Sequence, residues 1–226
     1  MWREQVRHLG GTRVLTPALG GFAGLPRGTV TMTDMAEDVA AAMSAAGVER
    51  ATVAGVSMGG YVALELVARH PARVARLLLA DTRPGADSAE TAQGREEQAA
   101  RALADGPSAL ADELVVKLLG TTTLRERPDL AAEVKGWIGV APRDAFAGAQ
   151  RGMAARRDRS ALLPTITVPT AVVVGAEDVI TPPDVARAMA AAIPGATLHV
   201  IDRAGHLANL EAPEAWNAAL DALLQR

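Results

Sequence analysis

Apolar and polar positions along this chain alternate between two kinds of spacing. Short apolar runs predict buried strands at residues 51–54, 76–80, 170–175 and 198–202. Apolar residues at helical spacing predict helices at residues 35–47 and 61–67, the first ending at a glycine C-cap. Strands that alternate with helices favour an α/β fold, in which a mainly parallel sheet is covered on both faces.

One long segment breaks this alternation. Residues 83–163 contain no convincing strand, and Gly and Pro separate several helical patterns at residues 96–103, 109–119, 129–138 and 144–157. We interpret residues 83–163 as a helical cap inserted between two strands, and residues 1–82 and 164–226 as the core. A cap in this place would cover the carboxyl edge of the sheet and shape a pocket. The alternative is a purely structural excursion that packs away from any site.

The junction between the first buried strand and the following helix carries a possible nucleophile. Gly55-Val56-Ser57-Met58-Gly59 has the G-x-S-x-G form of a nucleophile elbow, in which a strained turn exposes the serine hydroxyl. Glycines two positions before and two after the serine leave room for strand and helix to cross closely. The alternative is that Ser57 only caps the helix.

A serine nucleophile needs a base and an acid that orients the base. Asp178 follows the strand at residues 170–175, and His206 lies in the loop after the strand at residues 198–202. The chain order of serine, acid and histidine is that of the α/β-hydrolases. Asp81, which follows the strand at residues 76–80, is the rival for the acid.

These motifs resemble the α/β-hydrolase-fold serine hydrolases, of the carboxylesterase and 3-oxoadipate enol-lactonase kind. The resemblance rests on G-V-S-M-G-G at residues 55–60, V-V-V-G-A-E-D at 172–178 and A-G-H-L-A-N-L-E-A-P at 204–213. It implies acyl transfer to water through a serine ester, with Ser57, Asp178 and His206 as the catalytic groups. It also implies that the backbone N–H of Met58 is one oxyanion-hole donor.

The chain departs from this family at its beginning. The family has three strands before its first helix and takes the second oxyanion donor from a loop after the third strand. Residues 1–9 already resemble the first helix, and a strand is predicted only at residues 13–16. The second oxyanion donor is therefore not identifiable, and our hypothesis is that the chain is an N-terminally truncated form. The predicted strand at 13–16 would lack its usual neighbour.

Several functions remain open on this sequence. A serine at the elbow favours hydrolysis of an ester, lactone or thioester of a small molecule. The same three groups could cleave an activated carbon–carbon bond or act as a cofactor-free perhydrolase (haloperoxidase). A non-catalytic ligand-binding protein or an inactive truncated hydrolase is the alternative from another class. Trp137, Phe146 and Met153 are candidate pocket residues in the cap, although apolar residues at helical spacing more often form core.

Composition and charge limit the kinds of binding partner that we expect. The 226 residues are 49% hydrophobic and 22% charged, with a formal net charge of -3, so nothing predicts binding to nucleic acid or an anionic membrane. The absence of cysteine excludes disulfides and thiol catalysis. No metal-ligand spacing is present, and we expect no metal and no cofactor. No apolar run is long enough to span a bilayer, and we expect a cytoplasmic protein. The oligomeric state stays open, with a homodimer as one option.

Overall fold

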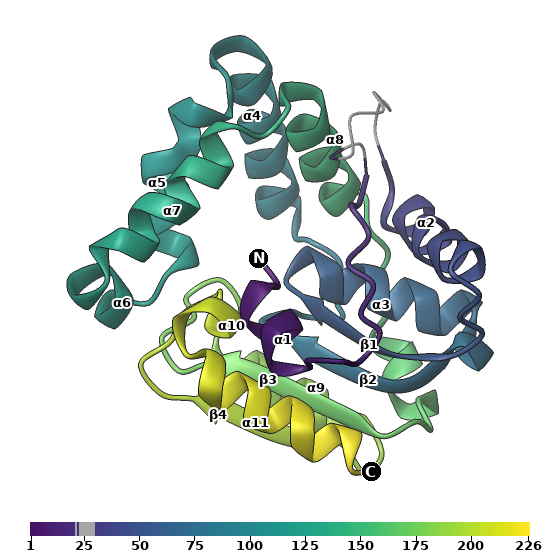
Figure 1. The fold of residues 1–226 in the computed structure, drawn as a ribbon. Coiled ribbons are helices and arrows are strands. Elements are labelled where there is room, and N and C mark those ends of the chain that lie inside the picture. Colours follow the sequence, from purple (N-terminus) through teal and green to yellow (C-terminus); the bar gives the residue numbers. More distant parts are fainter. Residues whose placement is uncertain (21, 23–29) are drawn as a thin grey trace.

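The sheet at the centre of the molecule is wholly parallel. The computed structural model describes residues 1–20, 22 and 30–226. Its sheet has four strands in the order β1-β2-β3-β4, namely β1 (Ala51–Val56), β2 (Val74–Ala80), β3 (Thr170–Gly175) and β4 (Thr197–Ile201). All four occur where the apolar runs predict strands (Figure 1). Within the described residues, β1 and β4 form the two edges of this sheet.

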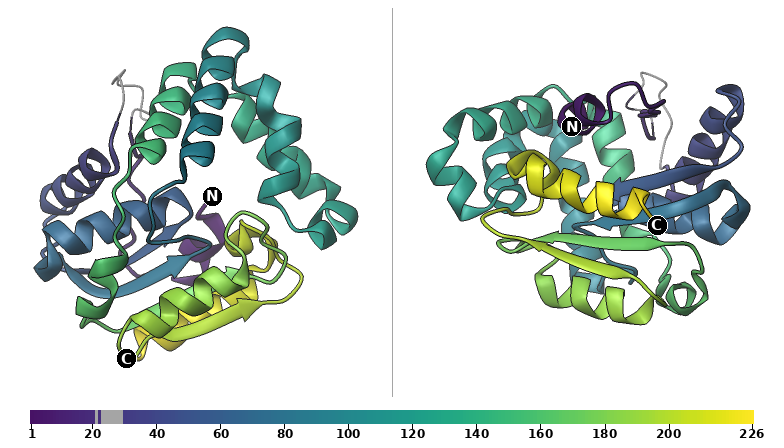
Figure 2. Two further views of the ribbon diagram at one scale, coloured as in Figure 1. Left: turned by 180° about the vertical axis from the view of Figure 1, so that it is seen from behind. Right: turned by 60° about the horizontal axis from the view of Figure 1, so that its bottom comes forward.

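Each face of the sheet has its own apolar core, because successive side chains of a strand point to opposite faces. Leu77 and Leu79 belong to the core shared with helices α2, α3 and α9. Leu78 and Ala80 belong to the core on the other face, where α11 packs. The helices covering the two faces, shown in Figures 1 and 2, are α2 (Met32–Ala45), α3 (Met58–Arg69), α9 (Pro183–Ala192) and α11 (Pro213–Leu224). A short 3-10 turn, η1 (Pro71–Arg73), joins α3 to β2.

Every regular element described between β2 and β3 is a helix or a 3-10 turn. The elements are α4 (Ala89–Asp105), η2 (Pro107–Leu110), α5 (Ala111–Leu118), α6 (Thr121–Glu126), α7 (Pro128–Gly139), α8 (Arg143–Ala154) and η3 (Ser160–Thr165). Helices α4 and α8 pack side by side, as do α5 and α7, and α4 to α8 stand apart from the sheet (Figure 1). We refer to α4 to α8 as the inserted helices.

Two of the helix boundaries differ from prediction because capping residues extend the helices. Helix α2 begins at Met32 rather than residue 35, since the Thr31 side chain accepts from the Asp34 N–H and Asp34 bonds back to Thr31. Helix α4 begins well before residue 96, since the Ser88 hydroxyl accepts from the Thr91 N–H at 3.1 Å.

Helix α6 was not predicted. Its sequence opens with Thr121-Thr122-Thr123, and β-branched residues have low helix propensity. The Glu177 carboxylate compensates, because it accepts from the Thr122 N–H at 2.8 Å at the helix start. This tertiary contact carries no signal in the local pattern.

The prediction of a strand at residues 13–16 is wrong. These residues form no regular structure, and the Leu15 side chain is 39% exposed. A strand needs a neighbour for its backbone hydrogen bonds, and residues 13–16 pair with none of the four strands of the described sheet. The Arg13 guanidinium instead donates to the Ala46 carbonyl.

The predicted helix at the start of the chain is present as α1 (Arg3–His8) and is fixed to the C-terminal part of the fold. The Trp2 ring meets the edge of the buried Trp216 ring on α11, with centroids 5.7 Å apart. The buried Gln5 amide donates to the carbonyl of Asn209 at 3.0 Å, within the short helix α10 (Ala208–Glu211). Helix α1 thereby buttresses the loop that carries His206.

Candidate active site

Ser57 occupies a strained turn between β1 and α3. Its φ is 54° and its ψ is -117°, a region that L-residues other than glycine rarely adopt. The Ser57 N–H donates to the Ala80 carbonyl at 2.9 Å, which ties the turn to the end of β2. The side chain makes no hydrogen bond to the helix, so the alternative that Ser57 is only an N-cap is wrong.

The close crossing of β1 and α3 depends on Gly55, and Gly60 makes room for Thr82, which follows β2. A Cβ at Gly55 would lie 2.2 Å from the Gly59 carbonyl oxygen. A Cβ at Gly60 would lie 2.5 Å from side-chain atoms of Thr82, whereas one at Gly59 would meet nothing within 4 Å. The expectation that Gly59 provides space for this crossing is therefore wrong, whereas the expectation for Gly55 is confirmed.

His206 lies between Ser57 and Asp178. Its Nε2 is 2.7 Å from the Ser57 Oγ, and its Nδ1 is 2.8 Å from the Asp178 Oδ2. The imidazole is 1% exposed. When Nδ1–H donates to the carboxylate, Nε2 is left unprotonated and accepts the Ser57 O–H.

The Asp178 carboxylate is buried and held by the turn that follows it. Its Oδ1 accepts from the N–H groups of Ile180 and Thr181 at 2.8 and 3.0 Å, and its Oδ2 accepts from the Thr181 hydroxyl at 2.6 Å. Burial acts to raise the pKa of Asp178, but the hydrogen bonds and charge of His206, with those of Thr181, outweigh it and leave the pKa below its ordinary value. Asp178 is therefore ionised at neutral pH.

Asp81 lies close by but makes a different contact. Its Oδ1 accepts from the Gly175 N–H at 2.9 Å, where β3 ends, and its Oδ2 is buried without a hydrogen-bond partner among the described residues. Burial, with the nearby charges of Asp178 and Glu211, raises the pKa of Asp81 well above its ordinary value, despite the Gly175 bond. The carboxyl group that contacts His206 is that of Asp178.

Met58 is the first residue of α3. The first N–H groups of a helix have no acceptor inside the helix, and the helix dipole there favours negative charge. The Met58 N–H thus stands immediately beside the Ser57 hydroxyl without an intrahelical partner.

The three pocket candidates have different surroundings. Trp137 on α7 is 36% exposed. Phe146 on α8 is half-buried, and Met153 packs against the core that includes α2 and α3. The Met153 Sδ also lies 3.3 Å from the Arg95 guanidinium. Contact of any of the three with a ligand stays a prediction.

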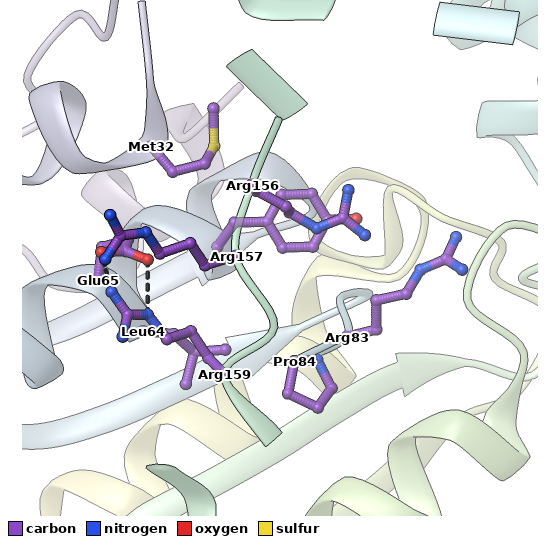
Figure 3. A pocket seen from close by; sticks show the side chains of 9 residues that line it. Met32, Leu64, Glu65, Arg83, Pro84, Arg156, Arg157 and Arg159 are labelled. Atoms are coloured by element: carbon purple, nitrogen blue, oxygen red, sulfur yellow. Dashed lines mark hydrogen bonds and ion pairs between the residues drawn. The ribbon is translucent and has the colours of Figure 1, made fainter. Parts of the chain in front are cut away.

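Sequence reasoning missed an arginine-rich recess where the inserted helices join the core (Figure 3). The lining of this recess includes Tyr61, Glu65 and four arginines (Arg83, Arg156, Arg157 and Arg159). The Arg156 guanidinium stacks over the Tyr61 ring at 4.1 Å from its centroid, and Arg159 forms a two-pronged ion pair with Glu65 at 2.6 Å. Tyr61 and Glu65 both belong to α3, so these contacts fasten the chain that follows α8 to α3 (Figure 3). The run R-R-D-R at residues 156–159 was the available signal.

Among residues 1–20, 22 and 30–226, no group of three or more His, Cys, Asp or Glu side chains could hold a metal ion. No helix of that same part of the chain is both long and apolar enough to cross a membrane.

A strained serine after a parallel strand, with a histidine at its hydroxyl and a buried carboxylate behind the histidine, is the arrangement of the serine hydrolases. Residues 1–213 match the family described as alpha/beta hydrolase fold. The chain therefore belongs to the α/β-hydrolase-fold family.

Solved and curated proteins agree with this assignment. A thermophilic esterase from Thermogutta terrifontis, with malate bound, is 37% identical at a TM-score of 0.95, covering 99% of this chain and 84% of that one. The enol-lactonase from Burkholderia xenovorans LB400 is 28% identical at a TM-score of 0.91, covering 100% and 86%. The pimeloyl-[acyl-carrier protein] methyl ester esterase of Aromatoleum aromaticum is 32% identical over 223 residues, which are 90% of this chain and 84% of the esterase. These relatives support a hydrolase that acts on esters or lactones.

Proposed function

We propose that this protein hydrolyses a carboxylic ester, lactone or thioester of a small molecule through an acyl-serine intermediate. The observation that carries the proposal is the chain of short contacts from the Ser57 Oγ through His206 to Asp178. A serine hydroxyl is a weak nucleophile unless a base removes its proton, and His206 stands at the right distance to do so.

In the first half of the reaction, the Ser57 Oγ attacks the substrate carbonyl carbon while its proton passes to the His206 Nε2. The Met58 N–H stabilises the negative charge on the carbonyl oxygen. The bond to the leaving group then breaks, and the proton on Nε2 moves to the leaving oxygen or sulfur. Asp178 keeps its charge throughout and stabilises the imidazolium.

In the second half, water gives a proton to the His206 Nε2 and attacks the acyl carbon. The bond to the Ser57 Oγ breaks, the serine takes the proton back, and the carboxylic acid is released. The reaction consumes one water molecule and needs no metal or other cofactor for its electron balance. Residues 83–163 form the cap over this site in our proposal, so that the choice of acyl and leaving groups depends on them.

The test is covalent labelling with a fluorophosphonate, followed by intact-mass measurement, for the protein and its Ser57→Ala variant. We expect a single adduct on the protein and none on the variant, together with a fall in ester turnover on the order of 10⁴-fold or more. A panel of simple esters, lactones and thioesters then identifies the preferred bond. Absence of labelling in folded protein, or equal labelling of the variant, would refute the proposal.

A further inference from the structure

The loop that carries His206 is held by a buried carboxylate just behind it. Glu211, at the end of α10, is 8% exposed. Its Oε1 accepts from the N–H groups of Gly205 and Leu207 at 2.9 and 3.2 Å. Since Gly205 and Leu207 are the two neighbours of His206, one oxygen fixes the backbone on both sides of the imidazole.

The second oxygen of the same carboxylate binds the inserted helices. The Glu211 Oε2 accepts from the Gly120 N–H at 2.8 Å, and Gly120 is the residue from which α6 begins. Arg127, at the start of α7, donates to the Glu211 carbonyl at 3.0 Å. Glu211 thus contacts the histidine loop and the inserted helices at once.

The two segments meet backbone to backbone at this point. A Cβ at Gly205 would lie 2.2 Å from the Gly120 nitrogen, and a Cβ at Gly120 would lie 2.6 Å from the Glu177 Oε2. Neither glycine has room for a Cβ, so a shift of one segment must displace the other or break the hydrogen bonds to Glu211. Packed contacts of this kind transmit displacements because the interior is close-packed.

The chemistry of the carboxylate suits this double role. Its two oxygens both accept, and hydrogen bonds to an ionised acceptor are roughly twice as strong as neutral ones. Within the described residues no cationic side chain bonds to it, so its partners are all backbone N–H groups. An amide in the same place has a single accepting oxygen and must turn an NH₂ toward one of the two segments.

We propose that Glu211 is a positioning residue that couples the placement of His206 to the placement of the inserted helices. The inference rests on the proposed function, because it assigns His206 as the catalytic base. A base displaced by about 1 Å loses on the order of 10²-fold in rate, so a movement of α6 reaches the chemistry through Glu211. Substrate contacts on the inserted helices and proton transfer at His206 are then linked.

Three variants separate this role from a merely structural one. Glu211→Met removes both oxygens in a side chain of similar length. Glu211→Gln keeps one accepting oxygen, which we expect to face the histidine loop, where two hydrogen bonds are made. Glu177→Gln is the matched control, because Glu177 binds Thr121 and Thr122 of α6 through its side chain and meets the histidine loop only through its backbone N–H.

We expect Glu211→Met to lower kcat and the fluorophosphonate labelling rate by about 10- to 100-fold in folded protein, following the cost of a misplaced base. Glu211→Gln should recover most of that kcat and, like Glu177→Gln, mainly raise KM. Folded Glu211→Met with kcat within twofold of the parent would overturn the proposal.

Amide hydrogen exchange on the unsubstituted protein covers the case in which Glu211→Met does not fold. The amides of Gly120, Gly205 and Leu207 should exchange with one common protection factor, which a bound fluorophosphonate raises together. Independent exchange of Gly120 overturns the coupling. If the fluorophosphonate does not label Ser57 at all, the proposed function fails. The exchange rates of the three amides in the protein without inhibitor still test whether Glu211 couples the histidine loop to the inserted helices.

Discussion

The hydroxyl of Thr181 offers a quantitative test of how the acid is held. Thr181 is 1% exposed, and its Oγ1 donates to the Asp178 Oδ2 at 2.6 Å. Thr181→Val keeps the shape and the backbone N–H of the residue but removes this donor. A hydrogen bond to a charged group contributes about 1.5–3 kcal/mol to stability, and we expect the free energy of unfolding to fall by that amount.

Urea denaturation at pH 7.5 measures the loss, with Thr181→Ser as the control. The serine variant keeps the hydroxyl and loses one methyl group, which costs about 1 kcal/mol by burial alone. In a thermal melt the valine variant should fall by about 3–12 °C, since 1 kcal/mol shifts the Tm of a chain this size by roughly 2–4 °C.

The pH dependence of the same variant has a definite sign. The pKa of Asp178 lies below its ordinary value in the folded protein, with the Thr181 bonds among the causes. Its stabilising contribution is therefore complete above the unfolded pKa of about 3.9 and is lost as the pH falls through the folded pKa. In Thr181→Val the folded pKa rises toward the unfolded value, so the stability lost on acidification is smaller and its loss is complete at a higher pH. A valine variant that unfolds within 0.5 kcal/mol of the parent, about the effect of a neutral surface substitution, would refute the reasoning.

Two further substitutions test the fold around the site. Gly60→Ala places a Cβ 2.5 Å from Thr82 atoms, and we expect this overpacking to destabilise the protein by about 1–3 kcal/mol. Gly59→Ala is the control, because its Cβ meets nothing within 4 Å and its melting temperature should be unchanged or slightly raised. Equal melting temperatures for the two variants would contradict this expectation. Asp81→Asn tests the raised pKa of Asp81. Above a pH of about 3.9 the folded parent binds more protons at this position than the unfolded chain does, so the parent loses stability as the pH rises. The stability of the asparagine variant relative to the parent should therefore grow between about pH 4 and pH 7.5, and a constant difference in urea titrations would show that the folded state does not raise this pKa.

Much of the fold follows from local pattern alone. The four strands occur where short apolar runs predict them, and the pattern is clearest in β3, which is buried at every position. The elbow at Ser57 is likewise local, since a G-x-S-x-G segment between a strand and a helix restricts the turn that can join them. Chain order then brings Ser57, Asp178 and His206 to the same edge, because parallel strands end together there.

Contacts between distant segments decided the rest. Asp81 and Asp178 both follow neighbouring strands, and only the loop after β3 aims a carboxylate at the His206 Nδ1. The strand predicted at residues 13–16 does not form, because pairing depends on an available neighbour and not on the apolar pattern of the segment. Helix α6 and the hydrogen bonds of Glu211 arise in the same way. Periodicity records which face of a segment is buried, whereas the partner that satisfies a buried donor or acceptor is set by chain segments far away in the sequence.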